Sequence, residues 1–249
     1  MRTFSHVAGW LLALAVPAGA VSISNLTVAT TLFRDNFESG GFSPSVGTWT
    51  TVGPDVTVTN AVSPGPAEGS FYASLFRDSN TNNQGNLQAS FAAQNTAGDV
   101  ILLRMMVYLN DSVDTRAQLL LDNGDFNSAR AWVVPDGAGH VLAIGPGFSR
   151  TNTGLTYAIN QWQEWDLQYT IGASTFSVTV NGATASGFTS FTTGGASKAD
   201  LFNGASNPSG TFFLDAVPPA STGAPEPGAW MLALGGLAAV AVRRIRSTR

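Results

Sequence analysis

The sequence has no cysteine and almost no histidine. Its 249 residues include two histidines, His6 and His140. Without cysteine there can be no disulfide bond, thiolate nucleophile or cysteine-ligated zinc. His140 is the only histidine beyond the N-terminal segment, and no Gly-x-Ser-x-Gly pattern accompanies it. We therefore expect His140 to be an ordinary loop or strand residue and not a catalytic base.

Charged residues are also scarce, at 11% of the chain. The segment 21–224 holds seven basic and fifteen acidic residues, which gives a formal charge of −8. A sparse acidic surface argues against nucleic acid or anionic lipid as a partner of this segment. Glycine, serine, threonine and asparagine are abundant instead, and this composition is typical of a β-rich extracellular domain with many turns.

Hydrophobic periodicity predicts short strands separated by turns. Residues 165–171 alternate between apolar and polar, Thr175–Val180 follows after a Gly-Ala-Ser turn, and Asn181-Gly182 is a strong hairpin signal. Ala183–Ser197, rich in glycine, serine and threonine, is expected to be a loop. We predict an all-β fold, an antiparallel jelly-roll β-sandwich over 21–217, followed by a linker at 218–224. Further strands are expected at 52–59, 100–109, 117–121, 131–134, 141–144 and 211–217.

The first 20 residues resemble a secretory signal peptide. Arg2 supplies a positive charge, Val7–Val16 forms a short apolar core, and Ala18 and Ala20 give the small-x-small cleavage pattern. The apolar core is short for a membrane-spanning helix. We therefore predict cleavage after Ala20 by signal peptidase and export of the chain that follows.

The end of the chain, residues 225–249, combines three parts. Pro225, Glu226 and Pro227 precede the apolar run Ala229–Val242, and a basic cluster with Arg243, Arg244 and Arg246 closes the sequence. As a helix the run spans roughly 21 Å, against ~30 Å of bilayer hydrocarbon, and arginine stems can extend it by snorkelling. A buried core helix is the alternative. The terminal position, the lack of a polar face and the arginines favour a transmembrane helix with its basic end in the cytoplasm.

These three parts, in this order, resemble the PEP-CTERM sorting signal of exported proteins from Gram-negative bacteria. The resemblance implies that an exosortase, a membrane cysteine transpeptidase, recognises the signal and cuts near Pro225–Pro227. It also implies an inner-membrane intermediate and a final location at the cell surface or outside the cell. A hydrophobic tail of this kind is a removable signal and does not imply a permanent anchor.

Three stretches of the body follow a second pattern. They are Phe33–Gly40 with Trp49 and Gly69–Leu75, the hairpin residues Gln161–Trp165 with Thr175–Gly182, and the closing strand Phe212–Val217. Together they resemble secreted carbohydrate-binding jelly rolls and concanavalin-like domains. The matched positions are mostly structural, so the resemblance implies the fold more than an activity.

Two pairs of acids are candidates for a structural calcium ion. In the resembled modules the acid after the first-strand phenylalanine meets the acid of the last strand at a calcium ion, which implies Glu38 and Asp215 here. Asp122 and Asp125, in an Asp-Asn-Gly-Asp turn, are a second candidate because calcium prefers oxygen ligands. The turn lacks the rest of an EF-hand loop, and a plain hairpin turn is its alternative.

One strand carries the candidates for carbohydrate chemistry. Trp162 and Trp165 offer flat aromatic faces that can stack on sugars, unless they are core or edge residues of the sandwich. Glu164 and Asp166 lie on one face of a strand, as the paired carboxylates of a glycosidase would. The third acid of the concanavalin-like glycosidase pattern is missing, because Tyr169 takes its place.

Three functions therefore remain open. The leading hypothesis is an exported, non-enzymatic surface or matrix protein that binds extracellular polysaccharide. The alternatives are a secreted glycoside hydrolase that acts through Glu164 and Asp166, and a purely structural surface protein whose tail is the functional element.

Overall fold

The structure is a computed structural model, and it describes residues 21–77, 85–111, 116–124, 126–204 and 209–217. The chain divides into two compact units, 1–217 and 218–249, and every described residue belongs to the first. The signal peptide predicted at 1–20, the linker at 218–224 and the sorting signal at 225–249 lie outside the described residues. Within the described ranges, no helix is long and apolar enough to cross a membrane.

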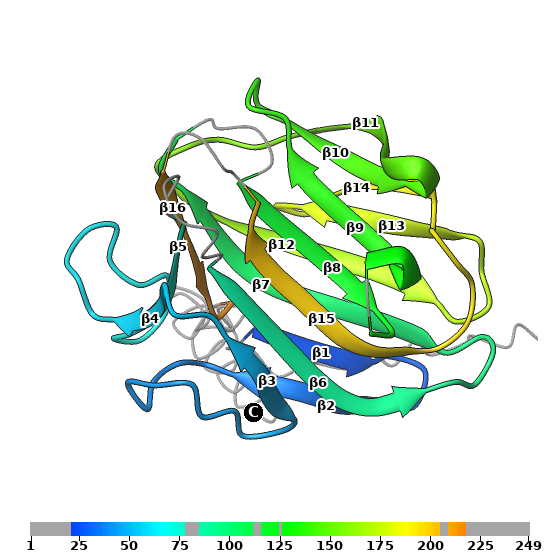
Figure 1. Cartoon of the computed structure of the whole chain (residues 1–249), viewed down its shortest axis with the longest axis horizontal. Coiled ribbons are helices and arrows are strands. Elements are labelled where there is room, and N and C mark those ends of the chain that lie inside the picture. Colours follow the sequence, from blue (N-terminus) through cyan, green and yellow to red (C-terminus); the bar gives the residue numbers. More distant parts are fainter. Residues whose placement is uncertain (1–20, 78–84, 112–115, 125, 205–208, 218–249) are drawn as a thin grey trace, which may run out of the picture. The chain divides into compact units, whose positions relative to one another are not determined.

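The described residues form two antiparallel sheets stacked face to face (Figure 1). The predicted all-β jelly-roll sandwich is therefore confirmed. The nine strands of sheet A are β1 (Val21–Asn25), β2 (Thr30–Asp35), β4 (Val56–Thr59), β5 (Tyr72–Arg77), β7 (Val100–Leu109), β12 (Trp162–Thr170), β13 (Thr175–Val180), β14 (Ala183–Thr189) and β16 (Gly210–Asp215). The seven strands of sheet B are β3 (Thr48–Val52), β6 (Asn86–Gln94), β8 (Ala117–Asp122), β9 (Ala131–Pro135), β10 (His140–Gly145), β11 (Ser149–Thr156) and β15 (Ala196–Asn203).

Strand β7 organises sheet A. One edge pairs along its whole length with β12. The other edge is shared, because β16 pairs with residues 106–109 and β1 with residues 101–104. Both run antiparallel to β7, so the end of β16 meets the start of β1. The first and last strands of the domain therefore lie end to end along one neighbour.

Side-chain alternation builds the core between the sheets. On β7 the buried Leu103, Met105 and Val107 face sheet B, and the residues between them face outward. Sheet B contributes inward side chains such as Leu119 and Leu201. The dense apolar run at 100–109 is a strand because it lies in the middle of sheet A, with pairing partners on both edges.

Two sequence-based boundaries were wrong. The predicted loop Ala183–Ser197 contains strand β14, an exposed edge strand, and the first residues of β15. The predicted strand at 52–59 is divided, because the chain turns at residues 54–55 and passes from β3 in sheet B to β4 in sheet A. Of the single strand predicted at 52–59, only the second half, Val56–Thr59, forms one continuous strand.

Two short 3-10 turns, η1 (Phe126–Ser128) and η2 (Pro146–Phe148), interrupt the hairpins of sheet B. Hairpin β13–β14 turns at Asn181 and Gly182, which have φ values of 49° and 82°. Two consecutive positive φ angles are the geometry that Asn-Gly favours in a two-residue hairpin. This predicted turn is confirmed.

Candidate functional site

The outer face of sheet A carries a compact group of aromatic and charged side chains. Trp162 is the cross-strand partner of Tyr108, and Tyr108 is the partner of Phe213. All three rings are half-buried, and the Trp162 and Phe213 ring centroids lie 5.5 and 5.8 Å from that of Tyr108. One row away on the same face lie Met106 and Glu164. We call these five residues, with Arg104, the Trp162 patch.

Arg104 is held in place by the two acids of β12. Its Nε and Nη2 donate to the two carboxylate oxygens of Asp166 at 2.9 and 2.7 Å, and Nε lies 3.2 Å from Glu164 Oε1. The hydrogen bond to Asp166 raises the pKa of Arg104. Burial, together with the nearby charge of Asp166, raises the pKa of Glu164. The sequence brought the two carboxylates to one face as predicted, and there they fix an arginine.

The position of Trp165 decides between its two interpretations, a sugar contact and a core residue. The prediction paired it with Trp162 as a sugar contact, but its side chain is fully buried in the core. The period-two alternation of β12 sends Trp162, Glu164 and Asp166 outward and Trp165 inward. Trp165 therefore has no face available to a ligand, and the alternative of a core residue applies to it.

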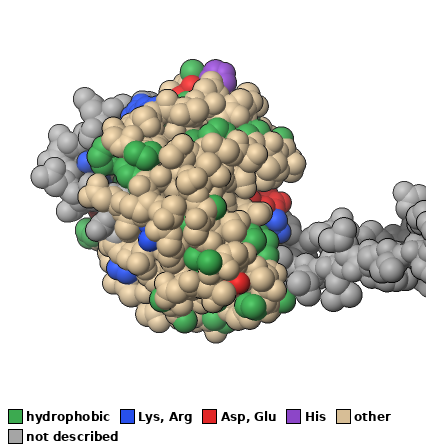
Figure 2. Space-filling view, turned by 90° about the vertical axis from the view of Figure 1, so that its right-hand side faces the viewer, with side chains coloured by type: hydrophobic (Ala, Val, Ile, Leu, Met, Phe, Trp, Pro, Cys, Tyr) green, Lys and Arg blue, Asp and Glu red, His purple; other side chains and the backbone are tan. Residues whose placement is uncertain are grey.

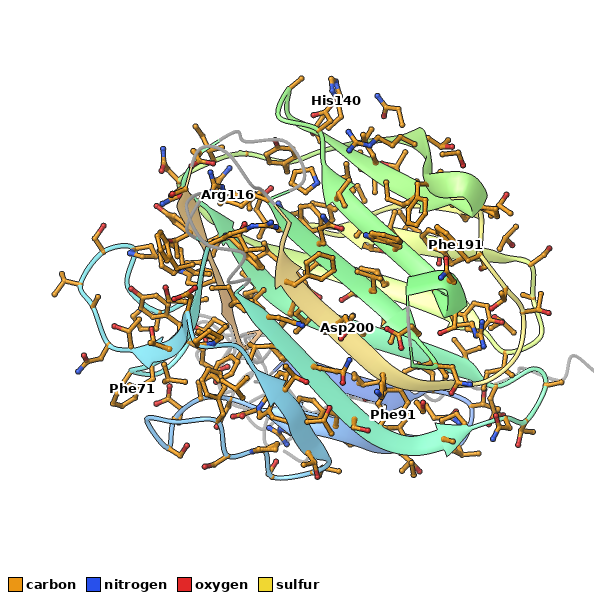
Figure 3. All side chains as sticks on the ribbon, viewed as in Figure 1. Phe71, Phe91, Arg116, His140, Phe191 and Asp200 are labelled. Carbon is orange, nitrogen blue, oxygen red and sulfur yellow. The ribbon has the colours of Figure 1, made fainter. Side chains whose placement is uncertain are left out.

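Glu38 and Asp215 meet at the loop that precedes β5. Glu38 accepts hydrogen bonds from the backbone N–H groups of Ser70 and Phe71 at 2.9–3.0 Å. Asp215 accepts from the N–H groups of Ala67 and Glu68 at 2.6 and 3.1 Å. The two acids therefore clamp one loop, residues 65–71, although 177 positions separate them in the sequence. Phe71, at the end of this clamped loop, is labelled in Figure 3.

The clamped loop passes close to Glu38, with a glycine at the point of nearest approach. Gly69 has φ +66°, and a Cβ atom there would collide with the Glu38 carboxylate. Burial raises the pKa of Asp215 to about 7, against the lowering effect of its backbone donors, and the charge of Glu38 adds to the rise. Among the described residues no group of three or more histidine, aspartate or glutamate side chains is arranged to hold a metal ion.

The second predicted metal pair is only partly described. Asp125 lies outside the described residues, and Asp122 lies on the outer face of sheet B next to Asp200, which sequence analysis did not single out. Burial, then the hydrogen bond and charge of Asp200, raises the pKa of Asp122 to about 8. Asp122 Oδ2 is buried with no hydrogen-bond partner among the described residues, an environment that favours the protonated form of Asp122. The neighbour of Asp122 is a second acid from another strand.

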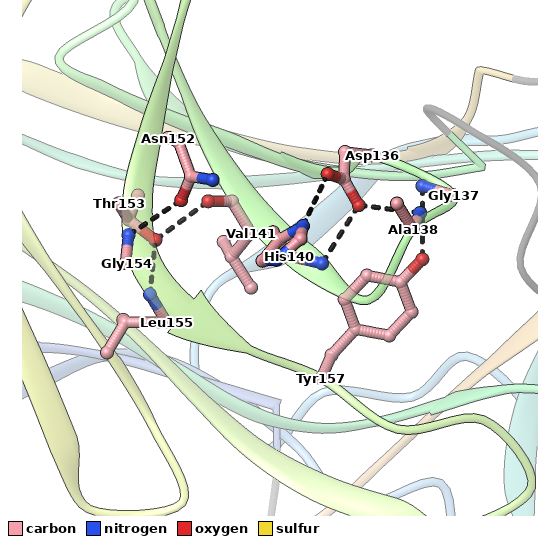
Figure 4. Close-up of polar contacts among 10 residues, drawn as sticks. All are labelled: Asp136, Gly137, Ala138, His140, Val141, Asn152, Thr153, Gly154, Leu155 and Tyr157. Carbon is pink, nitrogen blue, oxygen red and sulfur yellow. Dashed lines mark hydrogen bonds and ion pairs between the residues drawn. The ribbon is translucent and has the colours of Figure 1, made fainter.

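His140 stabilises the turn between β9 and β10 (Figure 4). Its Nδ1 lies 2.9 Å from Asp136 Oδ2, and its backbone N–H donates to Asp136 Oδ1 at 2.8 Å. Burial works to raise the pKa of Asp136, but the hydrogen bonds from His140 and Ala138 outweigh it and lower that pKa. Tyr157 completes the turn by accepting the Gly137 N–H at 3.1 Å. These contacts give His140 a structural role.

The surface outside these groups is weakly charged. Figure 2 shows one side of the molecule, where acidic and basic side chains are few and hydrophobic ones form small separate areas. Local concentrations of aromatic and polar side chains therefore stand out against the rest.

Comparison with known proteins establishes the fold. No protein-family model and no curated protein matches the chain. A solved sialidase chain has a TM-score of 0.51 and 10% identity over 82% of this chain and 19% of its own, so this chain spans about a fifth of the sialidase. Domain 4 of AbnA, an extracellular arabinanase from Geobacillus stearothermophilus solved with arabinotriose, has a TM-score of 0.41 and 11% identity, covering 82% and 96% of the two chains. The carbohydrate-binding module CBM66 from Bacillus subtilis has a TM-score of 0.36 and 12% identity, covering 57% and 88%. At these identities the sialidase match supports the β-sandwich fold alone.

Proposed function

We propose that this protein is an exported, non-enzymatic surface or matrix protein that binds extracellular polysaccharide through the Trp162 patch. The observation that carries the proposal is the juxtaposition of three half-buried aromatic rings with the Arg104–Glu164–Asp166 network on one sheet face. Aromatic faces stack on the apolar faces of sugars, and oriented planar polar groups hydrogen-bond to hydroxyls.

The rigidity of the patch supports binding. Trp162 Nε1 donates to the Gly65 carbonyl at 2.9 Å, and its ring makes edge contacts with Tyr72 and Tyr108. Arg104 is fixed by a two-point hydrogen bond to Asp166. Side chains that are already ordered lose little conformational entropy when a ligand binds, so a weakly charged polymer can be held by few contacts.

Glycoside hydrolysis is the runner-up, and the same contacts argue against it. A retaining mechanism needs one free carboxylate as nucleophile and one protonated acid. Both oxygens of Asp166 accept from Arg104, and Glu164 also lies against Arg104. A carboxylate held in this way by a guanidinium is a poor nucleophile, and we assign the two acids the role of positioning Arg104.

Binding is tested by native gel electrophoresis with arabinan, xylan, β-glucan or galactomannan cast into the gel. We expect retardation by at least one polymer, and a loss of affinity of at least about tenfold in Trp162→Ala, equivalent to 1.4 kcal/mol. Phe76→Ala removes another exposed aromatic of sheet A and serves as the matched control. Glu164→Gln is a milder change in the same patch, and it tests the proposal if Trp162→Ala fails to fold. It should also weaken binding.

Unchanged binding in both Trp162→Ala and Glu164→Gln would refute the patch as the binding site. Release of reducing ends from a retarding polymer, abolished in Glu164→Gln, would instead establish the hydrolase.

We also propose that signal peptidase and an exosortase process the chain, through an inner-membrane intermediate, to a surface or extracellular form in a Gram-negative bacterium. The support is the sequence of both ends, with Ala18 and Ala20 before the first strand and Pro225–Pro227 after the last. The intact mass of the native protein should correspond to a chain that begins near Val21 and ends near the Pro225–Pro227 motif. A species that retains Ala229–Arg249 in the surface fraction would contradict the sorting proposal.

A structural calcium ion at Glu38 and Asp215 is a subsidiary proposal. The donor chemistry supports it, because two carboxylates converge on one loop and Glu68 Oε2 in that loop is buried with no hydrogen-bond partner among the described residues. When bound, the ion would supply charge compensation for these acids and take no part in chemistry.

A further inference from the structure

The outer face of sheet B carries a second group of aromatic side chains. The Trp132 and Phe191 rings stack with centroids 5.6 Å apart, and Phe148 meets both edge-on at 5.8 and 5.5 Å. These three residues, which we call the aromatic cap, come from β9, from η2 and from the segment between β14 and β15. Trp132 is buried, Phe191 is half-buried and Phe148 is 56% exposed. The cap therefore presents aromatic surface to solvent.

The backbone at Phe148 is unusual for an exposed aromatic residue. Phe148 has φ 59° and follows Gly147 with φ 68°, so two successive residues adopt the left-handed region. Glycine or asparagine meets that requirement with less strain than a phenylalanine does. A strained residue whose side chain is largely exposed is a candidate for function, because packing alone does not explain it.

A row of side chains continues from the cap across the same face, through the buried Leu120 and Asp200 to the more accessible Gln88 and Thr50. Leu120 is the cross-strand partner of both Trp132 and Asp200, and Asp200 is also the partner of Gln88. Gln88 Nε2 donates to Asp200 Oδ1 at 2.8 Å, and Thr50 Oγ1 donates to Gln88 Oε1 at 3.0 Å. Strands β9, β8, β15 and β6 are neighbours, so the row spans roughly 14 Å at the usual strand spacing. Asp200 and Phe191 are labelled on this face in Figure 3.

The charges along this row fit a neutral ligand. Lys198 Nζ lies 3.3 Å from Gln88 Oε1, beside the acid pair Asp122–Asp200. The positive charge of Lys198 offsets the negative charge of that pair. Thr50 and Phe148 are exposed and Gln88 is half-buried, so planar amide, hydroxyl and aromatic groups are what this face offers. Flat apolar and hydrogen-bonding surfaces side by side match the two kinds of surface on a sugar ring.

We propose that the aromatic cap and its polar row form a second saccharide-binding surface, so that one molecule joins two polysaccharide chains. The outer faces of two stacked sheets point in opposite directions, and the Trp162 patch lies on the other one. A chain bound on one face leaves the other face free. The bivalency rests on the proposed function, since it needs the Trp162 patch as the first surface.

The test measures binding and cross-linking separately, with the polymer that retards the protein in native gels. The variants are Phe148→Asn, in which asparagine tolerates the left-handed backbone, Gln88→Ala in the polar row, and Trp162→Ala on the opposite face. Binding is measured on immobilised polymer and cross-linking by light scattering of dissolved polymer. We expect wild type to cross-link, and each variant to bind roughly 100-fold more weakly through lost avidity and to form no network.

Wild-type scattering from both Phe148→Asn and Gln88→Ala would overturn the second surface and leave the proposed function intact. Loss of all binding in Trp162→Ala, with unchanged binding in Phe148→Asn, would show a single surface. If Phe148→Asn and Gln88→Ala lose all binding and Trp162→Ala loses none, the Trp162 patch is not the binding site and the proposed function must be revised. Concentration-dependent dimerisation without polysaccharide, abolished by Phe148→Asn, would assign the cap to a second copy of the chain and overturn the proposal.

Discussion

At the scale of single residues, two buried aspartates with raised pKa values, Asp122 and Asp215, affect how stability responds to pH. The folded-state pKa of Asp122 is about 8, against 3.8 for an ordinary aspartate. Between these values the folded state binds more protons than the unfolded state, so the free energy of unfolding falls as pH rises. Its contribution is most favourable below about pH 4, and the penalty is complete above pH 8. This is the reverse of a salt-bridged aspartate.

We predict that Asp122→Asn removes the contribution of Asp122 to this dependence and leaves that of Asp215. Asparagine keeps an oxygen for the Gly124 N–H and can donate to Asp200. The variant should be more stable than wild type at pH 9 by about 1–2 kcal/mol, or roughly 2–8 °C in Tm, and the difference should shrink towards pH 4. Thermal unfolding from pH 4 to 9 measures it.

Asp136→Asn is the control with the opposite sign, because the pKa of Asp136 is lowered by its hydrogen bonds. That variant should be the less stable one at neutral pH, with no gain at pH 9. An Asp122→Asn profile parallel to wild type would contradict the raised pKa of Asp122.

Sequence reasoning at this scale succeeded where alternation decides orientation. It placed Glu164 and Asp166 on one strand face, and the same alternation separates Trp162 from Trp165. It missed Arg104, because cross-strand partners 62 positions apart leave no local signal. Asp200 and the aromatic cap were missed for the same reason, since their neighbours come from other strands.

At the scale of elements, the boundaries depend on tertiary pairing. The segment 183–197 lacks a strong apolar pattern because β14 is an exposed edge strand, and its pairing with β13 is what makes it extended. The hairpins β9–β10 and β13–β14 could be predicted, since their turn residues determine the local geometry. The assignment of β3 and β4 to different sheets could not, because it depends on which distant strands each one pairs with.

The clamped loop at 65–71 is the element on which we predict a calcium effect. If the ion binds between Glu38 and Asp215, 100-fold saturation contributes about 2.7 kcal/mol, or roughly 5–10 °C in Tm. Thermal unfolding in calcium chloride against EGTA measures this difference.

Asp215→Asn should abolish the calcium effect and Asp136→Asn should retain it, since Asp136 lies in another loop. Equal melting temperatures of the wild type in calcium and EGTA would show that the two carboxylates act as loop clamps alone.

At the scale of the whole molecule, the meeting of β16 and β1 along β7 brings the two ends of the described domain together. We predict that a circular permutant, with Val217 joined to Val21 by a short glycine-serine linker and opened between Ala173 and Ser174, folds cooperatively. The opening lies in the turn between β12 and β13, where few contacts are lost.

A permutant opened between Met105 and Met106 divides the strand that pairs with β1, β12 and β16, and it should not fold. Circular dichroism and thermal unfolding distinguish the two. Failure of the first permutant with an intact linker would contradict the adjacency of the ends.

The same adjacency determines how the domain would carry tension. A pull transmitted along the polypeptide enters at Val21 and leaves beside Asp215, so the load bears on one edge of β7 and bypasses the packed interior. The rest of the sandwich then lies outside the path that carries the load. Tension would therefore load β1 and β16 first, and because β16 carries Phe213, it would reach the Trp162 patch before the middle of either sheet.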